Sequence, residues 1–430
     1  MKAAFSPFSF FGMPFSISSG LWLLTGFIRA IFELFDKSKS KNKKTKYNTS
    51  DIAVIIPAHN EELVITDCIK ALKQSFKKKQ IYVASDGSAD KTYTQAWTQR
   101  VNVLAINPGV GKAKAIVRLI NRYNLFKKYK FIFIVDADTK IDKNFAKNAL
   151  KLFEDRQIKV VFGTARIHWP SHILPKLGLY FVAYRERLNR MLQFFFIYGQ
   201  TWKYTNVPYV IPGFATIYRS QTLKKLEIDT PGLLIEDFNL AFQFHKKRLG
   251  KIGYSPALIG WDQHPDNLVD YWKQVRRWNI GFFQTVKKNG VWPSFFWLSL
   301  GLFMLEVTLH SIFLLFVPLL VLYWLFPLFP ANLNLSIYDG FVNLYSQIGP
   351  FKNVSLVSIL TTIFWYDYGM TVVFGLMGRK PQFIFYGLFF FIMHFITSLI
   401  LLSSIIPGFF GRSEGRWISP KRYAVKSVAV

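Results

Sequence analysis

Apolar residues are concentrated at the two ends of this 430-residue chain, whereas its middle has the composition of a soluble domain. The apolar runs cover residues 17–35, 295–329, 355–377 and 383–406. A membrane-spanning helix needs about 20 mainly apolar residues, and each run reaches about that length. The pattern therefore predicts membrane segments at both ends of the chain, with one soluble domain between them.

The run over residues 295–329 is too long for one comfortable helix and barely long enough for two. We expect a tight pair of helices with its break near Pro318. Residues 355–377 and 383–406 are each expected to form a single span. Three crossings after the soluble domain would leave the basic tail outside, and four would leave it inside, as the positive-inside rule favours. We therefore expect four crossings. The basic residues of the tail are Arg412, Arg416, Lys421, Arg422 and Lys426.

The formal net charge of +29 includes a polybasic run over residues 37–46, directly after the first apolar segment. This position fits either binding to an anionic leaflet or a solvated tether that fixes topology, and both interpretations stay open. A cleaved signal peptide is the less favoured alternative, because the basic run follows the apolar stretch. The charge pattern places residues 37 onward in the cytosol. Cys68 is the one cysteine, which excludes an intramolecular disulfide and a multi-cysteine zinc site.

Four short apolar runs in the middle of the chain alternate with helix-like segments. They cover residues 51–58, 81–87, 101–107 and 131–138. Residues 61–73 and 111–123 are two of the intervening helices. Such alternation predicts an α/β domain with a mostly parallel sheet and helices on both faces. Ligands bind beyond the carboxyl ends of strands in such sheets. The polar residues that fall there are His59, Asn60, Asp86, Asp136 and Asp138.

Asp136-Ala137-Asp138 follows the last of these strands and is the strongest local signal. Two carboxylates at this spacing can meet a divalent cation and the phosphates that it bridges, since magnesium takes one or two protein carboxylates with phosphate oxygens. An isolated Asp-x-Asp also arises by chance or caps a helix. The position on the strand raises the metal interpretation to equal standing with these alternatives.

Two glycine-containing turns lie near the same edge. Asp86-Gly87 fits a nucleobase or ribose contact, but in isolation an Asp-Gly turn followed by a helix N-cap is the favoured interpretation. Gly109-Val110-Gly111-Lys112 places an ammonium beside the exposed N–H groups of a helix start, which favours a phosphate. The spacing of a Walker loop is missing from this segment.

Further along, Glu236-Asp237 opens an amphipathic stretch, where the helix dipole alone would favour two acids. Gln274, Arg277 and Trp278 lie on a basic, aromatic segment before the membrane, which also fits a purely interfacial helix. Glu306 and His310 fall in an apolar run one turn apart. They can satisfy each other, which we favour over a role along an acceptor path.

In this order, the motifs resemble the inverting family 2 glycosyltransferases, and more narrowly the membrane-bound branch with cellulose, chitin, hyaluronan and poly-N-acetylglucosamine synthases. The resemblance covers about residues 51–290. It rests on Val54-Ile55-Ile56-Pro57-Ala58-His59-Asn60-Glu61-Glu62, Asp86-Gly87-Ser88, Gly111-Lys112-Ala113, Asp136-Ala137-Asp138, Pro212-Gly213-Phe214 with Arg219, Glu236-Asp237, a run from Pro265 through Leu268, Tyr271 and Gln274 to Arg277-Trp278, and the tail Trp417-Ile418-Ser419-Pro420-Lys421-Arg422.

The resemblance implies a GT-A-like fold, flanked by N- and C-terminal transmembrane helices, and a role for each matching residue. Asp237 would be the general base, Arg277 would stabilise the leaving diphosphate, Trp278 would stack on the acceptor sugar and Gln274 would brace the site. Mg²⁺ or Mn²⁺ would be held by Asp138 with Asp136. The residues implied to bind the nucleotide sugar are Pro57, Ala58, Asn60, Glu61, Asp86, Lys112 and Asp136.

By the same resemblance, the enzyme would use a UDP-sugar donor and a glycan or lipid-linked acceptor, and would form a β-glycosidic bond. It would be a multi-pass protein of the cell membrane with its catalytic domain in the cytoplasm, in contact with membrane lipids. An accessory subunit remains open, and no nucleic-acid-binding signature appears. The alternatives are a single-addition glycolipid synthase and, less favoured, a non-catalytic nucleotide-sugar or lipid sensor.

Three departures from the family pattern matter. The acidic pair often found before the Gly-Ser turn is Ser85-Asp86 here, Ile235 replaces a common threonine, and the N-terminal membrane region is short. The last departure argues against a full polysaccharide channel. The expected organisation is a membrane segment (1–36), a polybasic linker (37–50), a glycosyltransferase domain (51–290), transmembrane helices (291–408) and a basic tail (409–430).

Overall fold

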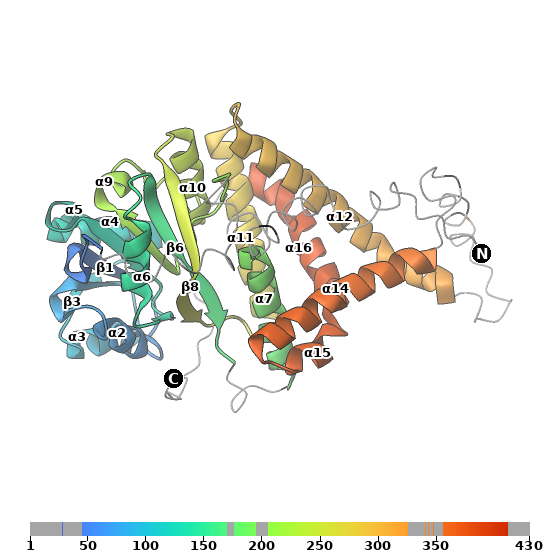
Figure 1. The fold of residues 1–430 in the computed structure, drawn as a ribbon, viewed down its shortest axis with the longest axis horizontal. Helices are drawn as coiled ribbons and strands as arrows, with labels where there is room; N and C mark the ends of the chain where they lie inside the picture. Colours follow the sequence, from blue (N-terminus) through green and yellow to red (C-terminus); the bar gives the residue numbers. More distant parts are fainter. Residues whose placement is uncertain are drawn as a thin grey trace. The chain divides into compact units, whose positions relative to one another are not determined.

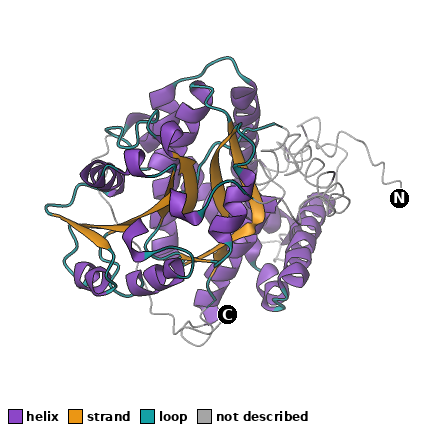
Figure 2. Cartoon of the chain, turned by 60° about the vertical axis from the view of Figure 1, so that its left-hand side comes forward, coloured by secondary structure: helices purple, strands orange, loops and turns teal. Residues whose placement is uncertain are grey.

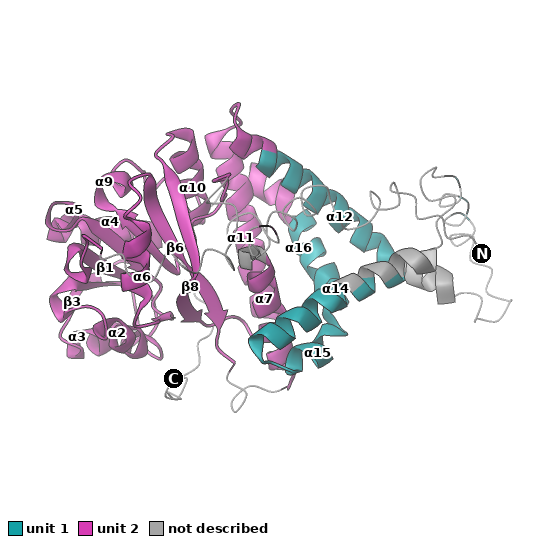
Figure 3. Ribbon diagram, viewed as in Figure 1, with its two compact units in different colours: residues 1–23, 299–403 teal, residues 24–298, 404–430 magenta. Residues whose placement is uncertain are grey.

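The computed structural model describes residues 45–169, 176–194, 205–325 and 356–411, together with residues 28, 340, 343 and 347. The expected span over residues 17–35, nearly all of the polybasic run and most of the basic tail lie outside the described residues. The contacts divide the chain into two compact units, residues 24–298 with 404–430 and residues 1–23 with 299–403 (Figure 3).

The unit of residues 24–298 and 404–430, magenta in Figure 3, contains one mixed sheet of eight strands in the order β3-β2-β1-β4-β7-β6-β8-β5 (Figure 1). Strands β1 to β4 run parallel, β7 is antiparallel to both neighbours, and β6 and β8 are parallel to each other and therefore to β4. All four predicted strands are confirmed. The strands are β1 (Ile52–Ala58), β2 (Ile81–Asp86), β3 (Asn102–Ile106), β4 (Phe131–Val135), β5 (Lys140–Ile141), β6 (Ile158–Ile167), β7 (Ala215–Arg219) and β8 (Lys251–Asp262).

Helices cover both faces of this sheet, as the alternation predicted (Figure 2). The helices of the soluble part are α2 (Ile65–Lys73), α3 (Thr92–Thr98), α4 (Lys112–Tyr123), α5 (Leu125–Lys128), α6 (Phe145–Leu152), α7 (Lys176–Phe194), α9 (Ser220–Leu223), α10 (Glu236–Lys246) and α11 (Leu268–Asn289). Strand β1 shows how the layers form, because its side chains alternate between two cores. Val54 and Ile56 face α2, α3 and α6, whereas Ala53 and Ile55 face α4 and α10.

Arg219, which belongs to a motif shared with the family, lies at the end of the sheet away from the carboxyl edge of β4. Arg219 pairs with Phe131 at the start of β4. Its guanidinium donates to the carbonyls of Ile158 at 2.8 Å and Phe153 at 2.6 Å, and to Tyr47 Oη at 3.0 Å. It therefore ties the segment that enters the domain to the sheet, which is a structural role.

Removing this guanidinium should lower stability without a matching change in chemistry. We expect Arg219→Met to reduce the free energy of unfolding by about 2–3 kcal/mol, because two carbonyls and a tyrosine hydroxyl lose a charged donor. Arg219→Lys should recover part of this, since one ammonium cannot reproduce the forked contacts. Thermal unfolding in detergent measures the effect, with the exposed Lys224→Met as control. An Arg219→Met protein that melts with the wild type would contradict the proposed role.

Among the residues that the structure describes, two helices are long and apolar enough to cross a membrane: α12 (Phe295–Leu325), over its segment Phe295–Pro318, and α16 (Phe390–Phe410). The expected break near Pro318 is wrong, because α12 is one helix of 31 residues that contains this proline. A helix of that length is about 46 Å long, and apolar helices tolerate proline where neighbouring groups satisfy the freed carbonyl.

The other two expected spans are also helical. Residues 355–377 correspond to α14 (Leu356–Gly378). Residues 383–406 are not one helix, because α15 (Gln382–Gly387) ends before α16 begins at Phe390. Gly387 lies against Thr371 of α14, where an added side chain would approach the threonine methyl to 2.7 Å. The close packing of α15 on α14 thus accompanies the interruption.

A polar pair lies within the unit of residues 1–23 and 299–403. His394 Nε2 of α16 lies 3.1 Å from Asp367 Oδ1 of α14. Ionisable groups in apolar helices usually pair with one another. The pairing of Glu306 with His310 stays a prediction.

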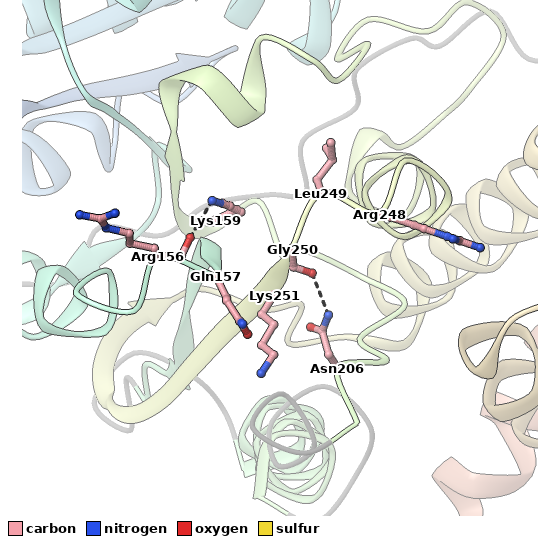
Figure 4. A pocket seen from close by; sticks show the side chains of 8 residues that line it. All are labelled: Arg156, Gln157, Lys159, Asn206, Arg248, Leu249, Gly250 and Lys251. Atoms are coloured by element: carbon pink, nitrogen blue, oxygen red, sulfur yellow. Dashed lines mark hydrogen bonds between the residues drawn. The ribbon is translucent and has the colours of Figure 1, made fainter.

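A shallow cavity of about 450 Å³ opens at the starts of β6 and β8, on the edge opposite the carboxyl end of β4. Four of its lining residues are basic: Arg156, Lys159, Arg248 and Lys251. Figure 4 shows Arg156 and Arg248 extending to opposite sides, so these cations do not converge on one point.

Candidate active site

Asp86 ends β2 and is buried, with 2% of its surface exposed. Its Oδ1 accepts from the N–H of Val110 at 2.8 Å, and its Oδ2 accepts from that of Gly111 at 2.8 Å. The carboxylate therefore shapes the loop that leads into α4. A direct contact with a nucleobase, as the resemblance implies, would require Asp86 to share or exchange these bonds, so that role stays a prediction.

The loop held by Asp86 is packed tightly against the turn after β2. Gly87 has φ +61°, and a Cβ added there would lie 2.8 Å from the backbone of Gly109. Neither position accommodates a side chain without movement of the backbone. His59 Nδ1 lies 2.6 Å from the Asp86 carbonyl, and Asn60 Oδ1 accepts from the N–H of Ala89 at 2.9 Å. The end of β1 thus stabilises the same turn.

The other predicted donor-binding residues at the end of β1 lie deeper. Pro57 and Ala58 are buried strand residues, and Glu61 is 3% exposed, with its backbone N–H donating to Thr92 Oγ1 at 2.8 Å. These residues therefore form the buried end of β1 at the carboxyl edge of the sheet.

Lys112, at the start of α4, connects three segments that are far apart in sequence. Its Nζ lies 2.9 Å from Asp136 Oδ1, after β4, and 3.0 Å from Glu236 Oε1, at the start of α10. Burial opposes its protonation, but the carboxylates of Asp136 and Glu236 raise the pKa of Lys112 well above its usual value. The ammonium therefore stays charged and holds the Asp136 motif beside the Glu236-Asp237 motif.

Asp237 lies against this cluster in the first turn of α10. Its Oδ2 accepts from the N–H of Gly213 at 2.9 Å. A Cβ added to Gly213 would lie 2.7 Å from Asp237 Oδ1 and 2.9 Å from Lys112 Nζ, so this glycine makes room for both groups. Burial, followed by the neighbouring Glu236 carboxylate, raises the pKa of Asp237 to about 8. A carboxyl group with such a pKa can exchange a proton near neutral pH.

Helix α11 packs beside α10 and carries the Gln274, Arg277 and Trp278 motif. A Cβ added to Gly281 would meet the Ile235 side chain at 2.9 Å, and the Leu234 N–H donates to Gln284 Oε1 at 3.1 Å. Ile235, which replaces the more common threonine, therefore packs directly on α11. This contact fixes Glu236 and Asp237 relative to the helix.

Trp278 has two neighbours that the sequence did not indicate. The guanidinium carbon of Arg185, on α7, lies 4.5 Å from the centre of a Trp278 ring. The ring of His264 meets Trp278 edge-on, with 6.3 Å between centroids and an interplanar angle of 78°. One face of Trp278 is therefore covered by a cation.

Asp138 is 8% exposed and lies two residues beyond Asp136, whose side chain is 33% exposed. Within the described part of the chain, no three His, Cys, Asp or Glu side chains are grouped as a metal-binding set. Two carboxylates fit Mg²⁺ or Mn²⁺ only when substrate oxygens and water complete the shell. The two residues would therefore fit only an ion that arrives with a diphosphate, and Asp138 and Asp136 would then be its protein ligands.

The structure gathers Lys112, Asp136 and Asp237, and holds Asp86 one loop away. Gln274, Arg277 and Trp278 share one helix beside them. Sequence reasoning left Glu236 without a role and missed Arg185 and His264. Only Glu236, inside a recognised motif, carried a signal, because the others become neighbours of the motif through folding alone.

Residues 53–223 match the family model described as Glycosyl transferase family 2. The poly-beta-1,6-N-acetyl-D-glucosamine synthase of Staphylococcus aureus is 25% identical over 265 residues, which cover 58% of this chain and 61% of that protein. The chain thus matches about three fifths of the length of these synthases. The probable glycosyltransferase YdaM of Bacillus subtilis is 26% identical over 298 residues, 64% of this chain and 68% of YdaM.

Solved structures show more distant similarity. The mannosyltransferase PcManGT of Pyrobaculum calidifontis, in complex with GDP-Man and Mn²⁺, aligns over 90% of this chain and 98% of its own, with a TM-score of 0.45 and 14% identity. Glucosyl-3-phosphoglycerate synthase of Mycobacterium tuberculosis, in complex with Mn²⁺, UDP-glucose and glycerol 3-phosphate, aligns over 60% of this chain and 88% of its own, with a TM-score of 0.38 and 15% identity.

Proposed function

We propose that this family 2 glycosyltransferase is a multi-pass membrane enzyme that transfers a sugar from a UDP-sugar to a glycan or lipid-linked acceptor and inverts the anomeric centre. The observation that carries the proposal is the position of Asp237, a buried carboxyl group held beside Lys112 and Asp136 at the carboxyl edge of the sheet. A proton acceptor thus lies next to a cation and a carboxylate suited to a diphosphate.

In this mechanism, Asp237 takes the proton of the acceptor hydroxyl. The acceptor oxygen forms a bond to the anomeric carbon as the bond from that carbon to the phosphate oxygen breaks. UDP leaves with the electron pair, and the proton on Asp237 then passes to solvent. One displacement from the opposite face converts an α-linked donor into a β-linked product.

Lys112 and Arg277 are assigned to the diphosphate. An ammonium at the start of α4, beside exposed N–H groups, suits phosphate oxygens, and Arg277 would stabilise the charge that develops on the leaving group. A divalent cation at Asp138 and Asp136 would neutralise further charge there when bound. Lys112 then needs only to exchange one carboxylate partner for a phosphate oxygen.

The acceptor is proposed to be a growing glycan, on the strength of the synthases that the chain resembles, with the single-addition glycolipid reaction as the second candidate. Helices α12 and α16 support a membrane location, because both are long and apolar enough to cross a bilayer. The basic run over residues 37–46, which follows the first apolar segment, favours the cytosolic face for the domain that comes after it.

Release of nucleoside diphosphate tests the proposal. Full-length protein in nanodiscs would be assayed with a panel of UDP- and GDP-sugars, with and without Mg²⁺ or Mn²⁺ and with membrane lipid as acceptor. Metal-dependent release from one donor supports transfer, and product length separates polymerisation from single addition. Binding of nucleotide sugar without release from any donor would instead favour a sensor.

The pKa of Asp237 gives the reaction a characteristic pH dependence. Because the base must be ionised, kcat/KM should rise with pH and level off above about 8, the value for the free enzyme. Glu236→Gln should move the rising limb to lower pH, since it removes the second cause of the raised pKa. A limb at the same pH in Glu236→Gln and wild type would show that another group controls the profile.

A further inference from the structure

Two buried polar residues at the end of β8 have no part in the mechanism above. Asp262 is 8% exposed and His264 is 7% exposed. His264 Nε2 lies 3.1 Å from Asp262 Oδ2. Among the described residues, the second polar atom of each, Asp262 Oδ1 and His264 Nδ1, is buried without a hydrogen-bond partner. Such atoms are rare in native proteins and call for a partner, either a ligand or bound water.

The strand register places this pair at the catalytic edge. Strand β8 runs parallel to β4, so its carboxyl end lies at the same edge as Asp136. Strand β5 pairs with β8 through Lys140 and Trp261, in antiparallel register. Continuing this antiparallel register by one residue places Asp262 opposite Thr139. Asp262 and His264 therefore lie next to the segment that contains Asp138.

The same pair adjoins the aromatic side chain assigned to the acceptor. His264 packs edge-on against Trp278, and Arg185 covers one face of Trp278. Gln274, one helical turn before Trp278, also has a buried oxygen, Oε1, without a partner in the described chain. An aromatic surface with a few convergent polar atoms is typical of sites for small polar ligands. A pyranose ring combines an apolar face with hydroxyl groups at its rim, and suits such a surface.

We propose that Asp262 and His264 hydrogen-bond hydroxyl groups of the acceptor sugar beside Trp278, and so select which hydroxyl reaches Asp237. The carboxylate accepts from one hydroxyl, and the free imidazole nitrogen bonds to another. Both are positioning residues, since neither reaches the reacting atoms. This inference rests on the proposed transferase function and adds the acceptor specificity of its site.

Kinetics with the acceptor varied separately from the donor test the inference. For Asp262→Asn and His264→Gln in nanodiscs, we expect the acceptor KM to rise about 10- to 100-fold, because each variant loses a hydrogen bond and leaves its buried partner unpaired. The donor KM and the slow hydrolysis of the donor without acceptor should stay as in the wild type. Asp262→Asn should also relax the choice of linkage, which analysis of the product measures.

His245→Gln is the matched control. His245 is also a buried histidine, with Nε2 2.8 Å from the Pro208 carbonyl and its ring stacked on Phe296. This variant should lower the melting temperature and leave the acceptor KM unchanged. If Asp262→Asn and His264→Gln behave in the same way, or raise the donor KM as much as the acceptor KM, the acceptor role is wrong.

Direct binding keeps the two proposals separable. Calorimetry would measure binding of N-acetylglucosamine and glucose oligomers without turnover. If the wild type binds oligomers and His264→Gln does not, the acceptor site is supported. If, in addition, no donor is turned over, the transferase function is rejected and the acceptor site still stands. Turnover with oligomer binding unchanged in both variants would reject the acceptor site and leave the transferase standing.

Discussion

Asp237→Asn should lower kcat by about 10²–10⁴-fold, the usual contribution of a positioned general base. The asparagine keeps the size of the side chain and can still accept from the Gly213 N–H, which lies 2.9 Å from Asp237 Oδ2 in the native protein. What it loses is the ability to take the acceptor proton. The fold should not suffer, because ionisation of a buried carboxyl group with a pKa near 8 beside Glu236 destabilises the native state.

Three measurements separate this result from a general loss of structure. Asp237→Asn should bind UDP with wild-type affinity in calorimetry and should melt no lower than the wild type. Asp155→Asn is the control, because the Asp155 side chain accepts from the N–H of Gln157 at 2.8 Å on the opposite edge of the sheet, away from Lys112 and Asp237. Asp237→Asn with transfer activity close to that of Asp155→Asn would exclude Asp237 as the base.

Local pattern was sufficient to predict the parallel half of the sheet. Each of the first four strands is a continuous apolar run followed by a turn, and the segment between neighbours is long enough for a helix. The antiparallel strand β7 was not predicted, because its place and direction in the sheet depend on pairing with β4 and β6. The helix break expected at Pro318 was wrong for a related reason. Proline breaks helices by local rules, yet α12 continues through it.

The candidate site likewise combines residues that local sequence predicted with contacts that only the assembled fold creates. Strand ends predicted Asp86 and Asp136 at one edge of the sheet, and in the structure they lie at the end of β2 and directly after β4. Asp237 was indicated by the resemblance alone, and its place beside Lys112 follows from the packing of α10. Sequence spacing could not show that both carboxylate oxygens of Asp86 accept from backbone N–H groups, or that Arg185 covers one face of Trp278. These contacts join segments 24 to 93 positions apart. No local periodicity encodes such pairs, and only the packing of the helices on the sheet creates them.

The contact that most depends on the assembled fold is that of Lys112 with Asp136 and Glu236. Lys112 is 20% exposed and Glu236 is 10% exposed, so their charges are poorly solvated. Burial opposes ionisation of Glu236, but Lys112 and local hydrogen bonds leave its pKa below the ordinary value. Removing one partner of a buried ion pair is strongly destabilising because the other charge remains in place.

Lys112→Met should therefore lower the free energy of unfolding by about 3 kcal/mol at neutral pH, the lower end of the range for buried pairs, since Asp136 is one third exposed. A depressed carboxyl pKa contributes stability at neutral pH that is lost as pH falls through the folded-state value. The difference in the free energy of unfolding between Lys112→Met and the wild type should thus shrink as acid protonates Glu236. Melting curves in detergent from neutral to acid pH measure it, with Lys114→Met, exposed on the same helix, as control. A gap that is absent at pH 7, or that does not shrink in acid, would mean that Lys112 matters only for the donor.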